Sequence, residues 1–498
     1  MTRKRIILVL TGVIFLVYFL LRIPGLTLQP VFCDEAIYIH WAQQMLENFH
    51  FYAFVPLTDG KTPLFMWLMT VPLRIISDPL AAGRILSVFS GLATVTGAIV
   101  LGKKFFNLRV GLIAGFLLSV IPFIVFFDKM ALVDSMLAAF SFWSLIFALN
   151  LTQKLSLKNI FLLGLTLGGG WLTKTPGVFA FVTLPVVIIS VKFKEVGIKR
   201  VLKTAAGLAA AAGIGFGIYN LLRFSPYFVN LSSRNQDYYF PFSRLLVTPL
   251  DPFIGHAHDL ADWLPKLITW PILILMAISV ILIAYKRNMV SLVIFLWGLL
   301  PLIAMMLLLK TFTARYVLFC FVPAIFLAAW TIDFLYSLLP VKRRIVPLIA
   351  VIILLLVPAF VFDYYLMTDP QKAPLPREER HGYLEDWTAG YGLKEIAGFM
   401  KSQARNQKIL LVTEGSFGTL PDGLDIYMGN DPNIEVWYST STLEPDVYSM
   451  AKLEPTYFVV NKSRLALNKD LKLLNEYPKA KQPDSTQDGL MLYQVLPK

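Results

Sequence analysis

The sequence predicts a polytopic α-helical membrane protein that ends in an extracytoplasmic α/β domain. Hydrophobic residues make up 56% of the 498 residues and charged residues only 15%, with a mean hydropathy of +0.64. A soluble protein carries about 25% charged residues. Apolar runs that are long enough to cross a bilayer, roughly 17–25 residues each, recur up to about residue 365 and then stop.

These apolar runs predict about eleven transmembrane helices. They occupy 6–21, 82–101, 110–127, 130–150, 159–173, 176–191, 201–222, 267–285, 289–309, 316–338 and 345–364. The first run has no small-residue cleavage site after it, so we expect a membrane anchor and not a signal peptide.

Lysine and arginine residues are concentrated in every second connection between the runs. They are Arg3, Lys4, Arg5, Lys103, Lys104, Arg109, Lys154, Lys158, Lys192, Lys194, Lys199, Arg200, Lys286, Arg287, Lys342, Arg343 and Arg344. By the positive-inside rule these connections and the N-terminus are cytoplasmic. The net charge of +13 therefore indicates contact with anionic membrane lipids and not with nucleic acid. We expect a multi-pass protein of the plasma membrane.

This topology divides the chain into two predicted domains. The first, 1–365, is a transmembrane domain with two outer loops, 22–80 and 223–266. The second, 366–498, lies outside the cytoplasm and opens with the polar, proline-rich linker "TDPQKAPLPREER".

Strand-like and helix-like stretches alternate in the second predicted domain. Apolar runs at 408–415, 434–439, 456–461 and 490–496 predict strands, and the stretches 391–405, 420–429 and 463–475 predict helices. This alternation is typical of a small α/β domain with a mainly parallel sheet.

Acidic residues stand at the outer side of the predicted membrane domain. Asp34 and Glu35 begin an amphipathic helix just after the first apolar run. One interpretation is helix capping, since carboxylates in the first turn interact favourably with the helix dipole. Asp134 lies within the fourth run, where an acid is costly and indicates a functional site. Asp128 stands at the outer end of the same helical hairpin.

Basic residues are expected on the same face. Lys61 lies in the first outer loop, Lys174 in the short outer turn "WLTKTPG", and Arg315 opens the tenth run beside Tyr316. A carboxylate can take a proton from a nucleophile, and cations can hold a departing phosphate. The pattern therefore indicates a site for a phosphorylated lipid near the membrane surface.

Several motifs resemble the glycosyltransferases that use polyprenyl-phosphate sugars and have the GT-C fold. This group includes the bacterial lipid A aminoarabinose transferases and the protein O-mannosyltransferases. "DEAIYIHWAQQM" resembles its Asp-Glu motif, "GKTPLFMWLMTVPLRI" its Lys-Pro-Pro-Leu segment and "DKMALVDSMLAAF" its second acidic motif. "AAGRILSVFSGLATVTGAIVLGKKFF" resembles its second span, and "GWLTKTPG" and "ARYVLFCFVPAIFLAA" resemble later motifs. The resemblance covers nearly the whole chain.

The resemblance implies a role for each matching residue. Asp34 matches the essential acid that serves as general base for the acceptor, and Glu35 orients the site beside it. Lys61 matches the lysine that contacts the lipid-linked phosphate, and Lys174 and Arg315 are further phosphate-binding candidates. The implied substrate-binding residues are Arg84, Asp128, Asp134 and Tyr316.

A divalent metal ion is the one cofactor that enters the sequence argument. Gly60 stands where aminoarabinose transferases carry a glutamate linked to a metal, so the chain departs from that subgroup there. His256 and His258 in "GHAHDLADW" are weak metal-ligand candidates in the second outer loop. Their alternative interpretation is as polar residues at the membrane interface or in contact with substrate.

The sequence thus predicts a hexosyl- or pentosyltransferase of the membrane. It would move a sugar from a polyprenyl phosphate to a hydroxyl of a glycan, lipid or protein acceptor on the outer side, with inversion. The alternative is a polytopic transporter or flippase of a lipid-linked substrate. Transporters place ionisable groups near the midplane, often in internally repeated halves, and this sequence has no repeated halves.

Overall fold

The computed structural model describes residues 3–191, 193–248, 250–340, 345–440, 442–466 and 470–497. The chain forms two compact units. The first consists of Met1–Leu26, Ala53–Leu68 and Arg84–Pro376, and the second of Thr27–Tyr52, Met69–Gly83 and Arg377–Lys498. The predicted division at residue 365 assigned 27–52 and 69–83 to the membrane domain, whereas in the structure they pack with the C-terminal residues.

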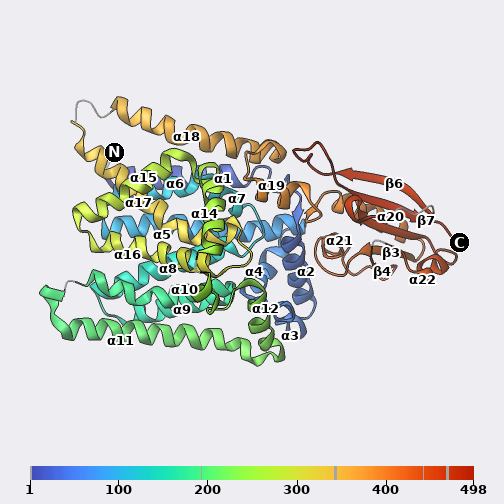
Figure 1. The fold of residues 1–498 in the computed structure, drawn as a ribbon, viewed down its shortest axis with the longest axis horizontal. Coiled ribbons are helices and arrows are strands. Elements are labelled where there is room, and N and C mark those ends of the chain that lie inside the picture. The colour runs from blue at the N-terminus through green and yellow to red at the C-terminus, as the bar shows by residue number, and fades with distance from the viewer. Residues whose placement is uncertain are drawn as a thin grey trace. The chain divides into compact units, whose positions relative to one another are not determined.

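The first unit is a helical bundle. Its long helices are α1 (Arg3–Arg22), α5 (Pro79–Phe105), α6 (Leu108–Val120), α8 (Asp134–Gln153), α9 (Leu157–Thr173), α11 (Phe193–Tyr219), α14 (Asp251–Leu264), α15 (Trp270–Lys286), α16 (Met289–Leu308), α17 (Leu318–Leu338) and α18 (Ile345–Thr368). Its shorter helices are α4 (Leu64–Leu73), α7 (Pro122–Asp128), α10 (Val178–Thr183), α12 (Asn230–Tyr238) and α13 (Arg244–Val247). Helix α9 packs between α8 and α11, and α17 packs on α16 (Figure 1).

The prediction of a polytopic helical membrane protein is confirmed, but the count of eleven spans is not. Among the described residues, seven helical segments are long and apolar enough to cross a membrane. An eighth is formed if α6 and α7, which meet at 61°, make one broken span. Pro122 begins α7, and a proline in this place interrupts a continuous helix because it lacks a backbone donor.

The three remaining predicted runs are not among these segments. The run 159–173 becomes the 17-residue α9, which extends about 26 Å at 1.5 Å per residue. The run 176–191 falls on the shorter apolar helical segment Thr175–Ser190. The run 345–364 falls on the 24-residue α18, within which Leu356–Thr368 is a shorter apolar segment. Four of the basic residues used to predict topology, namely Lys192, Lys342, Arg343 and Arg344, lie outside the described residues.

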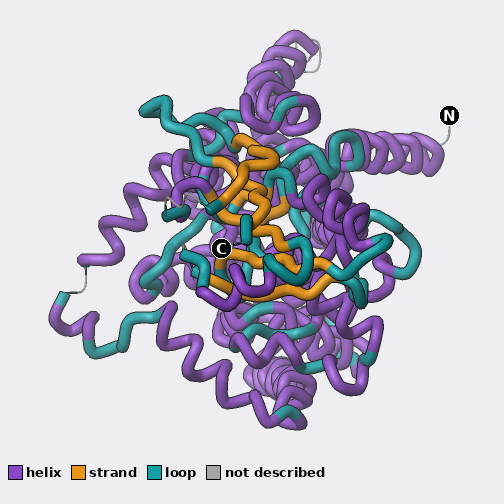
Figure 2. The backbone as a smooth tube through the Cα atoms, turned by 90° about the vertical axis from the view of Figure 1, so that its right-hand side faces the viewer, coloured by secondary structure: helices purple, strands orange, loops and turns teal. Residues whose placement is uncertain are grey.

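The second unit contains a five-stranded sheet (Figure 2). Its strands are β3 (Ile409–Glu414), β4 (Ile434–Ser439), β5 (Thr456–Asn461), β6 (Leu471–Pro478) and β7 (Gly489–Val495), and its order is β4-β3-β5-β7-β6. The pairs β3–β4 and β3–β5 are parallel, and β5–β7 and β6–β7 are antiparallel. The helices of this unit are α2 (Cys33–Glu47), α3 (Phe49–Tyr52), α19 (Arg377–Arg380), α20 (Leu393–Ala404), α21 (Asp422–Met428) and α22 (Pro445–Met450).

The α/β prediction is confirmed for most elements of this unit. All four predicted strands are present, as are the helices predicted near 391–405 and 420–429. The sheet is mixed and not mainly parallel. The helix predicted over 463–475 is wrong in its second half, where β6 pairs with β7. Because β6 is an edge strand with mostly exposed side chains, its sequence lacks the period-two pattern of a half-buried strand.

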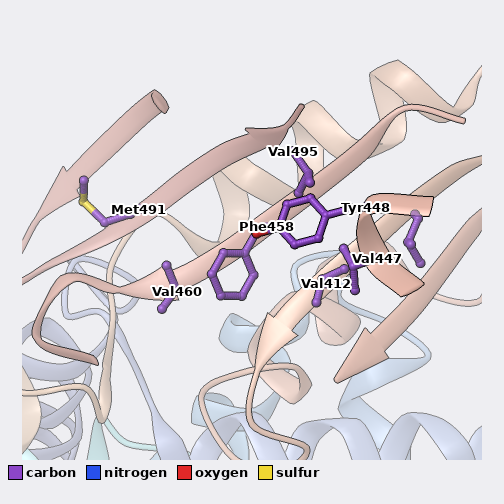
Figure 3. Close-up of a cluster of buried hydrophobic side chains, with 8 residues drawn as sticks. Val412, Val447, Tyr448, Phe458, Val460, Met491 and Val495 are labelled. Carbon is purple, nitrogen blue, oxygen red and sulfur yellow. The ribbon is translucent and has the colours of Figure 1, made fainter. Parts of the chain in front are cut away.

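The hydrophobic core of the sheet explains why β3 and β5 are apolar on both faces. On one face, Val412, Phe458 and Val460 pack against Val447 and Tyr448 of α22 (Figure 3). On the other face, α20 lies against the sheet, and its Phe399 ring is 5.6 Å from that of Tyr457 on β5. A strand that is covered on both sides reads as a continuous apolar run.

Helix α2 is anchored within the second unit. Just before it, β1 (Val31–Phe32) pairs in antiparallel fashion with β2 (Ala389–Gly390). Along its length it packs on α21, and the Gln43 side chain donates a 3.0 Å hydrogen bond to the carbonyl of Ile426. The helix that carries the two predicted acids is therefore a structural part of the C-terminal α/β unit.

A polar cluster strengthens the contact of α2 with α21. The Nδ1 atom of His40 lies 2.6 Å from a carboxylate oxygen of Asp422, whose other oxygen accepts a 2.7 Å bond from the backbone of Gly418. Burial alone would lower the pKa of His40, but the hydrogen bond and charge of Asp422, with Asp425 and Glu47, raise it above its usual value. Burial, assisted by the charge of Asp422, raises the pKa of Asp425 to about 6.

A buried ion pair joins α1 to α7 in the first unit. The Nε atom of Arg22 lies 2.8 Å from Oδ2 of Asp128, and both side chains are buried. Tyr18 donates its hydroxyl to the same oxygen at 3.0 Å. Gly91 on α5 makes room for the carboxylate, since a Cβ there would lie 2.0 Å from Oδ2.

Two further cations hold the chain where it leaves α1. Arg84 on α5 donates to the carbonyl of Leu26 at 2.8 Å, and Lys129, just after α7, donates to the carbonyl of Pro24 at 2.7 Å. Both side chains are buried. The turn after α1 is therefore held by side chains from two other segments of the bundle.

We expect Asp128→Asn to lower the free energy of unfolding by about 3–5 kcal/mol, because Arg22 would remain charged and buried without its counter-charge. Thermal unfolding of the detergent-purified protein would measure this. The control is Asp262→Asn, which removes the acid of the partly exposed Lys266–Asp262 pair and should cost at most about 1 kcal/mol. Equally small losses in both variants would contradict a stabilising role for the buried pair.

We expect the stability of the second unit to depend on pH through Asp425. Its folded pKa of about 6 exceeds the unfolded value of about 3.9. Its stabilising contribution is therefore complete below about pH 4 and is lost as the pH rises through 6. Asp425→Asn stays neutral, so it should gain on the order of 1–3 kcal/mol relative to the wild type between pH 4 and 7.

Melting temperatures at pH 4, 5, 6 and 7 would measure this divergence. The matched control is Asp446→Asn, at an exposed position on α22, whose melting curve should follow the wild type across the range. If the Asp425→Asn curve also runs parallel to the wild type, the elevated pKa is refuted.

Candidate active site

Four of the predicted site residues lie together in the first unit. Asp134 is the first residue of α8 and is buried, and its Oδ1 atom is 2.6 Å from Nζ of Lys174. The same Nζ atom is 4.1 Å from the centre of the Tyr316 ring, and the guanidinium of Arg315 lies 5.4 Å from that ring centre. Three segments that are distant in sequence thus meet, and we name these residues the Asp134–Lys174 cluster.

Close backbone packing places Lys174 at this position. The lysine follows the last residue of α9 and precedes the short 3-10 helix η2 (Thr175–Gly177). A Cβ at Gly177 would lie 2.4 Å from the backbone of Gly170. The absence of a side chain at Gly177 therefore lets the chain turn tightly against the end of α9, where Lys174 meets Asp134.

The cluster retains capacity to bind a polar ligand. Oδ2 of Asp134 is buried and has no hydrogen-bond partner within the described part of the chain. An ionised carboxylate accepts hydrogen bonds on both oxygens, so the second oxygen of Asp134 can accept one from a substrate hydroxyl. The ammonium of Lys174 carries three donors and is suited to a phosphate oxygen.

Lys61 belongs to a second charged group in the first unit. Its Nζ atom is 3.3 Å from Asp59, and Arg234 on α12 approaches the same carboxylate at 3.8 Å. Gly60, which stands between Asp59 and Lys61 in the chain, has a φ of +64°, a conformation that favours glycine. A Cβ at Gly60 would lie 2.4 Å from Cβ of Arg234, so a metal-linked glutamate would not fit here.

The two adjacent acids of α2 differ in their surroundings. Glu35 is fully buried, and its carboxylate accepts a 3.0 Å hydrogen bond from the backbone of Phe32. This is the capping role that the sequence suggested for the pair. Asp34 is only half-buried, and its predicted role as general base stays a prediction. Both belong to the second unit.

The structure places the other predicted substrate-binding residues inside the bundle of the first unit. Asp128 is engaged by Arg22 and Tyr18, and Arg84 donates to the carbonyl of Leu26. Their observed contacts are within the protein, and a role toward substrate stays a prediction.

The two histidines on α14 face different surroundings. His256 is buried, lies 2.8 Å from the carbonyl of Met306 and stacks on Phe312, whereas His258 is exposed. Residues two positions apart on a helix point to nearly opposite sides, so the pair is poorly placed to share one ion. No group of three or more His, Cys, Asp or Glu that could hold a metal occurs among the described residues.

Sequence reasoning missed three charged residues beside the predicted ones. Asp59 and Arg234 surround Lys61, and Arg22 neutralises Asp128. Arg22 ends an apolar helix, which could have suggested a buried pair with an acid in another span. No local pattern in the sequence distinguishes Arg234 from the other arginines of its loop.

Comparison with known families bears on the first unit. Residues 60–217 match the family described as dolichyl-phosphate-mannose-protein mannosyltransferase. This range includes Lys61, Asp134 and Lys174 but ends before Tyr316 and begins after Asp34. No curated protein matches the chain in sequence.

Solved structures with a similar fold cover almost the whole chain. ArnT from Cupriavidus metallidurans in the apo state matches with a TM-score of 0.57 and 16% identity, over 99% of this chain and 98% of that chain. The structure of the same protein bound to undecaprenyl phosphate matches with a TM-score of 0.57 and 15% identity, again over 99% of this chain and 98% of that chain. The archaeal oligosaccharyltransferase AglB from Archaeoglobus fulgidus, in complex with an inhibitory peptide and a dolichol-phosphate, matches with a TM-score of 0.56 and 11% identity. The match covers 98% of this chain and 74% of that chain. At these identities the likeness shows the fold alone, and the family match relates residues 60–217 to the dolichyl-phosphate-mannose-protein mannosyltransferases.

Proposed function

We propose that the protein transfers a sugar from a polyprenyl phosphate to an acceptor hydroxyl on the outer side of the membrane, with inversion at the anomeric carbon. The Asp134–Lys174 cluster is the observation that carries this proposal. It combines a buried carboxylate, an ammonium group and an aromatic ring in a unit that has the fold of lipid-phosphate glycosyltransferases.

The donor is held by cations in this proposal. Lys174, with Arg315 and Lys61, binds the lipid-linked phosphate through charge-assisted hydrogen bonds. Asp134 keeps the ammonium of Lys174 in place through Oδ1, and its Oδ2 accepts a hydrogen bond from a hydroxyl of the donor sugar. Negative charge on the phosphate increases as the sugar departs, so these cations stabilise the transition state more than the ground state.

The acceptor is activated by Asp34. Its carboxylate takes the proton of the acceptor hydroxyl, whose oxygen attacks the anomeric carbon. The bond from that carbon to the phosphate oxygen breaks, and the polyprenyl phosphate leaves with the electron pair. A single displacement inverts the anomeric configuration, and no step requires a metal ion. Glu35 supports this reaction by fixing the first turn of α2.

The orientation follows from charge. The basic connections mark the cytoplasmic side, which puts the segments that carry Asp34, Lys61 and Lys174 on the outer side of the plasma membrane. A sugar donor on that side is expected to be linked to a lipid, since nucleotide sugars are cytoplasmic substrates. The acceptor can be a glycan, a lipid or a protein.

The first test compares the wild type with Asp34→Asn in sugar release from a panel of polyprenyl-phosphate sugars. We expect turnover to fall at least about 100-fold when the base is lost, while binding of the donor, measured separately, survives. The matched control is Glu47→Gln, an exposed carboxylate at the other end of α2, which should retain turnover.

Equal turnover in the wild type and Asp34→Asn would remove Asp34 from the chemistry. If no donor in the panel is bound or turned over, the transferase proposal fails, and flipping of the same lipids in vesicles becomes the activity to measure.

A second test addresses the donor phosphate. Lys174→Met should weaken the binding of undecaprenyl phosphate roughly 10- to 100-fold, the usual consequence of losing a hydrogen bond to a charged group. The control, Lys286→Met, removes an exposed lysine at the end of α15 and should bind as the wild type does. Unchanged binding by Lys174→Met would exclude this lysine as a phosphate ligand.

A further inference from the structure

A pocket lies within the α/β unit, apart from the residues described so far. It has a volume of about 400 Å³, within the range of roughly 300–1,000 Å³ that is typical of ligand pockets. Glu414 and Gly415 line it at the end of β3, Ser439 and Thr440 at the end of β4, and Arg464 shortly after β5. It is therefore formed at the carboxyl ends of the three parallel strands.

The topology of the sheet makes this position a natural binding site. Strand β4, which follows β3 in the chain, lies on one side of β3 in the sheet. Strand β5, which follows β4, lies on the other side of β3. The order of the strands thus reverses around β3. In open α/β sheets, ligands bind outside the carboxyl ends of the strands at such a switch point. The strand order and the lining residues point independently to the same place.

The chemistry of the pocket is set by a fixed ion pair. Glu414 is only 7% exposed and accepts hydrogen bonds from the backbone of Asn461 at 2.8 Å and from Arg464 at 2.8 Å. The guanidinium of Arg464 lies 4.2 Å from the centre of the Trp387 ring, which holds it in place, while its side chain remains 43% exposed. A hydrogen-bond acceptor, Glu414, and a hydrogen-bond donor, Arg464, are thus held side by side, and their charges cancel.

This lining favours a neutral ligand that is rich in hydroxyl groups. An anion would meet the carboxylate of Glu414, a cation would meet Arg464, and an apolar group would displace water from the partly exposed guanidinium of Arg464 without offering it a hydrogen bond. A sugar hydroxyl can donate to the carboxylate and accept from the guanidinium at once.

The loop between the pocket and α21 also contacts α2. The ring of Phe417 lies 6.0 Å from that of Trp41. Gly418, with a φ of +111°, passes so close to α2 that a Cβ would lie 2.9 Å from Sγ of Cys33. Cys33 directly precedes Asp34. The pocket and the proposed general base therefore belong to one compact unit and are joined by a single packed loop.

We propose that this pocket binds a neutral carbohydrate, and that this carbohydrate is the glycan part of the acceptor. The first statement stands on the pocket alone, while the second rests on the proposed function. The C-terminal α/β unit would thereby select a hydroxyl-bearing acceptor and hold it on the same unit as Asp34.

Ligand-observed NMR on the full-length protein tests the binding statement. The probes are the methyl glycosides of glucose, galactose, mannose and N-acetylglucosamine, and inorganic phosphate, in a detergent without a sugar headgroup. We expect saturation transfer to at least one glycoside. Glu414→Gln and Arg464→Met should each weaken its binding at least about tenfold, because each removes a hydrogen bond to a charged group.

A neighbouring ion pair supplies matched controls. Lys462 and Glu476 lie 3.0 Å apart in the same unit and do not line the pocket, so Lys462→Met and Glu476→Gln should bind as the wild type does. Thr440→Arg, at the exposed rim, should block binding without touching the buried pair and serves if Glu414→Gln does not fold. Binding of no glycoside, or binding that survives Arg464→Met and Thr440→Arg, overturns the proposal. Phosphate binding that Arg464→Met abolishes would overturn it in favour of an anion site.

The acceptor statement has its own readout. Glycoside binding needs neither donor nor turnover, so it stands even if the transferase proposal fails. Where transfer is observed, Glu414→Gln should raise the KM for the acceptor more than it lowers kcat, with donor binding retained. A KM equal to that of Glu476→Gln would overturn the identification of the carbohydrate as acceptor.

Discussion

The ion pair of Arg22 and Asp128 is the interaction on which the arrangement of the first unit depends. Two charges inside a helical bundle are tolerated only when they meet with good geometry, so α1 and α7 have little freedom to move apart. Tyr18 and the missing side chain of Gly91 complete the same site. The neighbouring Lys129 then holds the chain as it leaves α1, just before the segment that passes into the second unit.

Hydropathy predicted the helices of the first unit well, because spans in a bilayer must be apolar throughout. It did not predict their number, since α9 is short and Pro122 divides a run that looks continuous. In the second unit, buried strands such as β3 and β5 were evident from their apolar runs. The edge strand β6 was not, because its pairing with β7 and not its own pattern determines its conformation.

The candidate site shows the same division. Asp134 and Lys174 were predictable one by one, since a charge within or beside an apolar run is costly, and the structure adds that they meet at 2.6 Å. Asp34 and Glu35 point in different directions from the first turn of α2, so one is half-buried and the other fully buried. Their adjacent positions in the sequence do not show which of the two is buried. The pocket around Glu414 was invisible in sequence, because three strand ends converge there only after the sheet has formed.

The antiparallel pairing of β1 with β2 has a consequence for biosynthesis. Residues 31–32 are among the first to be made, yet their strand partners are 389–390. Asp422, the partner of His40, is made 382 residues after it. At roughly 5–20 residues per second, the ribosome needs about 20–75 s to supply that partner. The contacts that hold the acid-bearing helix are thus completed only when the last part of the chain has been made. A prematurely terminated chain would lack β2 and Asp422, so α2 could not make the contacts that hold it in the second unit.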